Sequence, residues 1–164
     1  MKVNQVMNSN PVTCGPETTL RDVAGIIKKY HIGGIPVVEK GHVLGIITES
    51  DILRLLETGR ISEDLWLPSP LEIIEVPIRE FINWEKTRDA LTDFGGKPVR
   101  EVMHSPVITI GPDDSIEDAA ALILKKKISR LPVISDGQLV GIVTRRDIVE
   151  GVAAKSGELR ESGP

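Results

Sequence analysis

The chain has 164 residues, of which 40% are hydrophobic and 27% charged, and its formal net charge is −4. This length can bury a sizeable core. The negative charge and the 3% aromatic content argue against binding to a nucleic-acid backbone or stacking on bases. One cysteine excludes an internal disulfide, the three histidines share no metal-ligand spacing, and no apolar stretch is typical of a signal or membrane segment. We therefore expect a cytoplasmic protein with no metal site and no membrane contact.

The dominant pattern is an internal repeat, because residues 6–54 recur as residues 102–150 at a constant offset of 96 without a gap. Duplicating a unit with its own apolar face creates a pseudo-twofold interface, and a groove at such an interface is a natural ligand site. We therefore expect the function to lie between the repeats. The identities include Val6/Val102, Met7/Met103, Thr13/Thr109, Pro36/Pro132, Val37/Val133, Gly45/Gly141, Thr48/Thr144 and Asp51/Asp147.

In chain order, each repeat begins with a short extended run, at residues 12–14 in the first copy and 107–110 in the second. Gly-Pro follows, and then Thr19 or Ser115 with an aspartate three residues on, which is the capping-box signal for a helix start. The next apolar residues recur at helical spacing and predict an amphipathic helix. In the second copy these residues are Ile116, Ala119, Ala120, Ile123 and Leu124.

Two apolar runs come next, at residues 35–38 and 43–47 in the first copy, and a turn containing Gly41 separates them. The second copy repeats this pattern, with Gly137 in the turn. Both pairs predict a buried hairpin. A second helix should begin after Thr48 and Thr144. The predicted fold class is α+β, with two β-α-β-β-α repeats related by a pseudo-twofold axis and packed through their sheets.

The segment between the repeats differs from both, because three prolines interrupt it and apolar side chains are scattered through it. We predict a partly helical linker with an amphipathic helix near 78–94, in which Trp66, Phe81 and Trp84 are packing anchors. A polar tail should fray. The predicted boundaries are 1–60 for the first repeat, 61–97 for the linker, 98–154 for the second repeat and 155–164 for the tail.

Both repeats resemble cystathionine-β-synthase-type (CBS) domains, and the pair resembles a Bateman module. The resemblance rests on the stretches 31–38 (HIGGIPVV) and 127–134 (KISRLPVI), and on the closing signatures 45–52 (GIITESDI) and 141–148 (GIVTRRDI). It covers the chain except for the linker and the tail. One Gly-x-x-Thr-x-x-Asp signature would be weak, whereas two in the same register are specific.

The resemblance implies two clefts for adenosine-containing ligands, in which the aspartate of one repeat binds the ribose hydroxyls and the threonine lies near the α-phosphate. The other repeat would supply the wall that faces the base. Carried over by residue, one site would comprise Thr48, Asp51, Ile110, Ile128, Ser129 and Arg130. The second would comprise Thr144, Asp147, Thr13, Cys14, Ile32, Gly33 and Gly34, with Arg145 beside the threonine.

The residues themselves support such sites. A carboxylate accepts two hydrogen bonds from a vicinal diol, a helix start offers free N–H groups to phosphate, and glycines allow close approach of the backbone. The alternative is that Thr-x-x-Asp only caps the helix, which stabilises it by about 0.5–2 kcal/mol without a ligand. The two interpretations are compatible.

The two predicted sites differ in charge. Arg130 can reach a phosphate in the Asp51 site, whereas the equivalent position for the other site is Gly34. Arg145 and Arg146 precede Asp147, where they either contact phosphate or form a solvated helical turn. Glu49, which is equivalent to Arg145, should discourage a polyphosphate in the Asp51 site.

We therefore predict a regulatory module that senses AMP, ADP or ATP, requires no cofactor and signals to a regulated protein that the sequence does not identify. A sensor of S-adenosylmethionine and a ligand-free structural homodimer are the alternatives. An enzyme is disfavoured because the sequence contains no nucleophile–base or metal constellation. Surplus apolar residues on the second helices, such as Leu53 and Val149, predict a homodimer through these helices.

Overall fold

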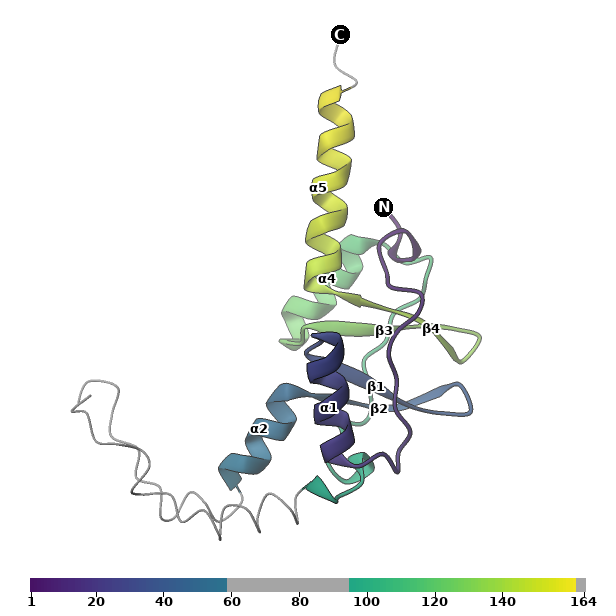
Figure 1. The fold of residues 1–164 in the computed structure, drawn as a ribbon. Coiled ribbons are helices and arrows are strands. Elements are labelled where there is room, and N and C mark those ends of the chain that lie inside the picture. The colour runs from purple at the N-terminus through teal and green to yellow at the C-terminus, as the bar shows by residue number, and fades with distance from the viewer. Residues whose placement is uncertain (59–94, 162–164) are drawn as a thin grey trace, which may run out of the picture.

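The computed structural model describes residues 1–58 and 95–161, which form two similar α+β units (Figure 1). The first unit contains α1 (Leu20–Tyr30), β1 (Gly34–Glu39), β2 (His42–Thr48) and α2 (Glu49–Thr58). The second contains α4 (Ile116–Lys126), β3 (Arg130–Ser135), β4 (Gln138–Thr144) and α5 (Arg145–Glu161). Single 3-10 turns, η1 (Val3–Gln5) and η3 (Val99–Glu101), precede the two units. The predicted order of helices and strands is confirmed.

Each hairpin is antiparallel and closes through a two-residue turn. In the first turn φ is +50° at Lys40 and +84° at Gly41, and the second turn is alike. Positive φ at both positions is the type I′ geometry that matches the twist of paired strands. The predicted extended runs add a parallel bridge to each hairpin, between Cys14 and Val37 and between Ile110 and Val133. These bridges complete the β-α-β-β pattern.

The starts of α1 and α4 confirm the capping signals. Thr19 Oγ1 accepts a hydrogen bond from the backbone N–H of Asp22 at 3.2 Å, and Ser115 Oγ accepts one from Asp118 at 3.0 Å. Both helices end at a residue in the left-handed conformation, His31 and Lys127, with φ of +52° and +55°. Each helix therefore has a defined start and stop in the positions that the repeat predicts.

The two units exchange the segments that lead into them. Val3, which precedes the first unit, is completely buried in the core of the second, and its equivalent Val99 is completely buried in the core of the first. Backbone hydrogen bonds hold both segments in place, from Val3 N to Asp114 O at 2.9 Å and from Val99 N to Thr18 O at 2.8 Å. The hydrophobic core of each unit is therefore completed by a valine from the segment that precedes the other unit.

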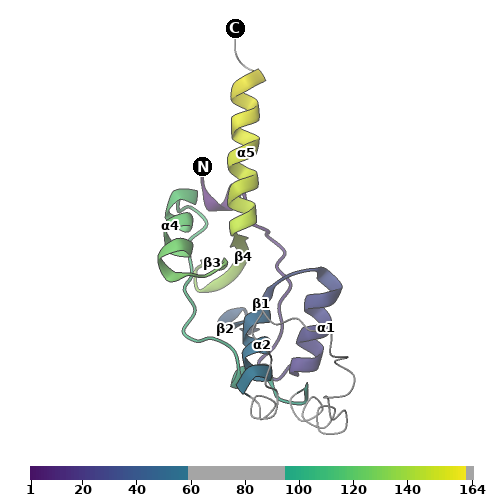
Figure 2. The same ribbon diagram turned by 90° about the vertical axis from the view of Figure 1, so that its left-hand side faces the viewer.

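The exchanged segments then continue along the opposite sheet. Asn8 forms an antiparallel bridge to Ile142 in β4, and its equivalent His104 forms one to Ile46 in β2. The sulfur atoms of Met7 and Met103 lie so close to Gly141 and Gly45 that a Cβ atom there would collide with them. The exchanged segments thus lie along the edge of each sheet, and Figure 2 shows the β3–β4 hairpin above the β1–β2 hairpin.

Two contacts between equivalent residues locate the pseudo-twofold axis. At the hairpin tips, His42 Nε2 lies 3.2 Å from Gln138 Nε2, and these positions are 96 residues apart. At the other end of the strands, Arg130 Nη1 donates to the carbonyl of Gly34 at 2.9 Å, across the same separation. Equivalent residues can touch only where they flank the axis, so the axis passes through both contacts.

Two predictions about the ends of the units have different outcomes. The linker helix at 78–94 and the anchors Trp66, Phe81 and Trp84 lie outside the described residues. The prediction of a frayed tail is wrong through residue 161, because α5 continues to Glu161 and extends beyond the sheets (Figure 1). Its second half is rich in Ala, Lys, Glu, Leu and Arg, all strong helix formers, and these outweigh the cost of Gly157.

The exchange of segments generates a first prediction. Val3→Ala should lower the free energy of unfolding by about 2 kcal/mol, because it removes two buried methyl groups from a closed core. Hydrogen exchange should accelerate in residues 116–143 and not in residues 20–48. Val99→Ala is the matched variant and should show the reverse pattern. Acceleration confined to the unit nearer in sequence would contradict the exchange.

Candidate functional site

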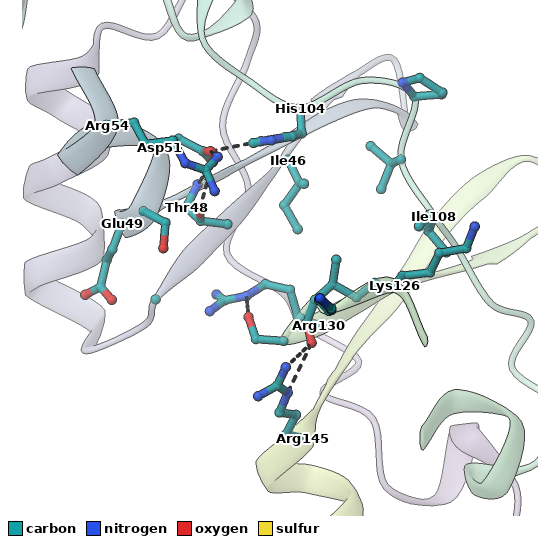
Figure 3. A pocket seen from close by; sticks show the side chains of 17 residues that line it. Ile46, Thr48, Glu49, Asp51, Arg54, His104, Ile108, Lys126, Arg130 and Arg145 are labelled. Atoms are coloured by element: carbon teal, nitrogen blue, oxygen red, sulfur yellow. Dashed lines mark hydrogen bonds and ion pairs between the residues drawn. The ribbon is translucent and has the colours of Figure 1, made fainter. Parts of the chain in front are cut away.

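Two clefts lie between the units, one at the start of α2 and one at the start of α5. The Asp51 cleft has a volume of about 560 Å³ and the Asp147 cleft about 450 Å³. Both are lined by residues of both units, and Figure 3 shows the first, with Asp51 on one wall and Arg130 on the other. Volumes of this size suit a small organic ligand.

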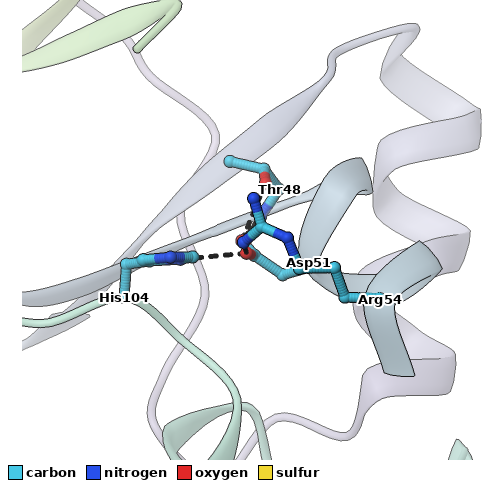
Figure 4. Close-up of polar contacts among 4 residues, drawn as sticks. All are labelled: Thr48, Asp51, Arg54 and His104. Carbon is cyan, nitrogen blue, oxygen red and sulfur yellow. Dashed lines mark hydrogen bonds and ion pairs between the residues drawn. The ribbon is translucent and has the colours of Figure 1, made fainter. Parts of the chain in front are cut away.

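The Asp51 carboxylate is buried and lies against Thr48, His104 and Arg54 (Figure 4). Oδ2 accepts from the backbone N–H of Thr48 at 2.8 Å and from its hydroxyl at 2.7 Å. Oδ1 lies 2.9 Å from Nδ1 of His104 and 3.4 Å from Nη1 of Arg54. A carboxylate offers about four lone-pair positions. A ligand hydroxyl would therefore compete with these groups for Asp51.

Asp147 repeats half of this arrangement. Its Oδ2 accepts from the N–H and the hydroxyl of Thr144, both at 2.7 Å. Within residues 1–58 and 95–161, no donor pairs with its Oδ1, because Asn8 and Glu150 stand at the positions equivalent to His104 and Arg54. The two clefts are therefore unequal, and Oδ1 of Asp147 can accept hydrogen bonds from a ligand.

The Thr-x-x-Asp contacts show that both aspartates cap their helices. In the second copy the cap is reciprocal, because the Asp147 N–H also donates to Thr144 Oγ1 at 3.3 Å. The first N–H of each helix is used as well, by Glu49 to the Gly33 carbonyl and by Arg145 to the Ser129 carbonyl, both at 3.2 Å. Fewer free N–H groups thus face a ligand than the sequence alone suggests.

Arginines supply positive charge to both clefts. Arg130, Ser129, Gly33 and Arg145 line both of them. Burial lowers the pKa of Arg130, and the negative charge of Glu49 acts in the opposite direction; an arginine nevertheless keeps its charge at neutral pH. Both Nε and Nη2 of Arg145 donate to the Ile128 carbonyl, at 3.1 and 2.7 Å. These groups can neutralise an anionic ligand.

Arg146 combines the two roles that the sequence left open. It lines the Asp147 cleft, and its Nε donates to Glu150 at 2.6 Å on the exposed side of α5. This ion pair raises the pKa of Arg146 through the hydrogen bond and the charge of Glu150.

Most of the sequence-predicted residues line the clefts in the expected groups. Thr48, Asp51, Ile128, Ser129 and Arg130 line the first, and Ile32, Gly33, Gly34, Thr144, Arg145 and Asp147 line the second. Three predicted residues, Ile110, Thr13 and Cys14, line neither of these two clefts. Ile110 and Cys14 are buried in the cores, where each bridges a central strand of its own unit. Residues slightly earlier in each run, Ile108 and Val12, form the walls instead.

Sequence reasoning missed the residues that the exchange of segments brings in. His104 and Asn8 belong to the lead-in segments and face the opposite unit. The available signal was the identity of Val3 and Val99, which extends the repeat upstream of residue 6. Lys126, the last residue of α4, and Lys127, its C-cap, also line the Asp51 cleft.

The structure of residues 1–58 and 95–161 also bears on metal sites and on membrane-spanning helices. Within these ranges no group of three or more His, Cys, Asp or Glu side chains is placed to hold a metal ion. The helices of the same ranges are too short or too polar for any of them to span a bilayer.

The presence of two similar units agrees with the comparison with known proteins. A family model of the CBS domain matches residues 3–58 and again residues 99–154. The chain belongs to the CBS-domain family. An uncharacterised protein of Methanocaldococcus jannaschii, MJ1426, is 40% identical over 154 residues, which cover 93% of this chain and 91% of that protein. This similarity extends over most of both chains.

Two solved structures of CBS-domain proteins share the fold. The CBS domain pair of protein MJ0100, solved with 5′-methylthioadenosine and S-adenosylmethionine, has a TM-score of 0.68 and 25% identity, covering 94% of this chain and 98% of that chain. CBSX2, solved with AMP, has a TM-score of 0.68 and 23% identity with the same coverage. The predicted fold class is thus confirmed.

The position of Cys14 generates a second prediction. Burial raises the pKa of its thiol from the ordinary 9.0 to about 11. Because the folded pKa exceeds the unfolded one, the thiol's contribution to stability is complete below pH 9.0 and is lost as the pH rises to about 11. At pH 8 Ellman's reagent should react with the urea-unfolded protein and hardly at all with the folded protein. Equal rates would contradict the burial of Cys14.

Proposed function

We propose that this chain is a regulatory module that binds adenosine nucleotides, of the class AMP, ADP or ATP, in the two clefts between its CBS domains. Occupancy would be relayed to a regulated protein by a change in how the two units pack. The observation that carries this proposal is the paired arrangement of a Thr-x-x-Asp carboxylate and a facing arginine in each cleft.

The chemistry of the two walls supports a nucleotide. A carboxylate beside a helix start suits a ribose diol, and a guanidinium on the opposite wall suits a phosphate. Apolar side chains between them, Ile46, Ile108 and Ile128 in the first cleft, offer faces for a base. The bound AMP in CBSX2 adds a precedent within the same fold.

S-adenosylmethionine is the second candidate, because the related MJ0100 pair was solved with it. It shares the adenosine group but carries a sulfonium and no phosphate. Glu49 in the Asp51 cleft could pair with the sulfonium charge. The excess of arginines over acidic side chains in the Asp147 cleft favours a phosphate instead. Parallel titrations with AMP and S-adenosylmethionine distinguish the two.

The carboxylates generate the third prediction. Calorimetric titration with AMP should report two sites in the unaltered protein. Asp51→Ala or Asp147→Ala should weaken one site each, by about 1.5–3 kcal/mol, the range for hydrogen bonds to a charged group. Circular dichroism and urea unfolding should verify that each variant folds, since both aspartates also cap helices.

The matched control for these variants is Asp22→Ala, which removes a helix-start aspartate that lines neither cleft. It should leave AMP binding unchanged. Unchanged affinity and stoichiometry in the Asp51→Ala, Asp147→Ala double variant would refute the proposed sites. AMP should be recovered intact after incubation, and turnover that disappears with either aspartate would favour an enzyme.

The donors around Asp51 generate the fourth prediction. His104→Asn places at this position the residue that its equivalent, position 8, already carries. In the Asp147→Ala background it should strengthen AMP binding by about 0.5–1.5 kcal/mol, because the ribose no longer competes with His104 for Oδ1 of Asp51. Asn8→His in the Asp51→Ala background should weaken binding. Weaker binding by His104→Asn would mean that His104 contacts the ligand.

Exposed apolar side chains support a homodimer as the assembly of this module. Leu53 on α2 and Val149 on α5 occupy equivalent positions and are 63% and 67% exposed. Both would be covered if the second helices packed across a twofold axis and buried at least ~1,000 Å².

The fifth prediction tests this assembly. Light scattering should report a dimer at micromolar concentration, and the Leu53→Glu, Val149→Glu double variant should be a monomer. Leu124→Glu is the control, because Leu124 is 73% exposed on α4 rather than on a second helix, and its substitution should leave the dimer intact. A monomeric parent protein, with and without AMP, would reject the dimer. Dimerisation without binding of any adenosine ligand would favour the purely structural module.

A further inference from the structure

Arg130 occupies a position that no other cationic side chain of the two clefts shares. It is the first residue of β3, and its guanidinium contacts Gly34, the first residue of β1 and its own equivalent. The contact therefore lies on the pseudo-twofold axis. A Cβ atom at Gly33 would lie 2.6 Å from Nη2 of Arg130, and one at Gly34 would lie 2.9 Å from Nη1. Only glycines at both positions leave room for the guanidinium on the axis.

The place on the axis makes Arg130 part of both clefts, and its hydrogen bonds leave it with one free end. Nε donates to Ser129 Oγ at 3.2 Å, and one N–H of Nη1 donates to the Gly34 carbonyl at 2.9 Å. Of the five N–H donors of a guanidinium, three remain, all on Nη1 and Nη2. These form a single fork, which can make one two-pronged contact with one phosphate at a time.

Arg145 also lines both clefts, but it is differently placed. Its Nε and one N–H of Nη2 donate to the Ile128 carbonyl of its own unit. Among the described residues, no hydrogen bond or ion pair joins Arg145 to its own equivalent, Glu49, which is an acid in the Asp51 cleft. Arg145 is therefore held to its own unit, whereas Arg130 joins the two units on the axis.

We propose that Arg130 couples the two clefts negatively, because a phosphate bound in one cleft takes the free fork of Arg130 and leaves the phosphate of a second ligand without it. This inference rests on the proposed function. The sharing of Arg130 would make AMP binding anticooperative without any change in fold. A ligand without phosphate should bind the two clefts independently, since it does not use the fork.

The test separates coupling from the intrinsic inequality of the clefts. Asp51→Ala and Asp147→Ala each leave one cleft, and calorimetric titration with AMP gives the affinity of that cleft alone. If the clefts were independent, the two binding steps of the unaltered protein would reproduce these two affinities. We expect the second step to be at least about tenfold weaker than the weaker single cleft, which is about 1.4 kcal/mol. Adenosine, which has no phosphate, should show no such difference.

Arg130→Gln, made in the unaltered protein and in both single-cleft variants, identifies the residue. Glutamine keeps an amide donor for the Gly34 carbonyl and loses the charge and the fork. Both clefts should weaken, and the difference between the second step and the weaker single cleft should shrink. Lys125→Gln removes the same charge from an exposed position outside both clefts and should change neither quantity. Arg145→Gln should lower affinity and leave the coupling in place.

The remaining outcomes overturn the inference. Two steps equal to the single-cleft affinities would show independent clefts that bind nucleotide, which refutes the coupling and keeps the proposed function. Positive cooperativity would show that Arg130 bridges the two phosphates. Negative coupling that is unchanged or larger in Arg130→Gln would show simple repulsion between the phosphates. If Arg145→Gln abolished the coupling instead, Arg145 rather than Arg130 would be the residue that couples the clefts. No AMP binding by the unaltered protein would refute the proposed function together with this inference.

Discussion

The burial of Val3 and Val99 in the core of the opposite unit is the constraint on which the rest of the structure depends. Neither unit closes its core from its own strands and helices. The segments that follow these valines must then cross between the sheets, where Asn8 and His104 pair with β4 and β2. These crossing segments, the helix starts and the first residues of the facing strands together line the clefts. Folding of the cores and construction of the sites are therefore one event.

Local patterns were sufficient to predict the parts of the structure that depend on near neighbours. The capping of α1 at Thr19, the turn at Gly41 and the carboxylate–threonine contact at Asp51 each involve residues three or fewer positions apart. The resemblance to CBS domains also predicted which surfaces of the two units face each other. It also grouped most of the cleft residues correctly, including Arg130.

The sequence could not predict features that depend on how deeply a side chain is buried or on contacts between residues far apart in the chain. Ile110 and Cys14 have the apolar character of a cleft wall, but the bridges to β3 and β1 draw them into the cores. Nothing in the local sequence of His104 indicates that it meets Asp51, since the two are brought together only by the exchanged segment. The helicity of the tail required weighing many small propensities against its polarity, and the propensities prevailed.

The contact between Gly34 and Arg130 also bears on why the two units are fused into one chain. In an exact homodimer of single units, every residue on the symmetry axis meets an identical copy of itself, so an arginine there would face a second arginine in the space that one guanidinium fills. Covalent linkage releases the two positions to differ. A single chain can therefore place an odd number of charges on its axis, an arrangement that no assembly of identical halves can reach.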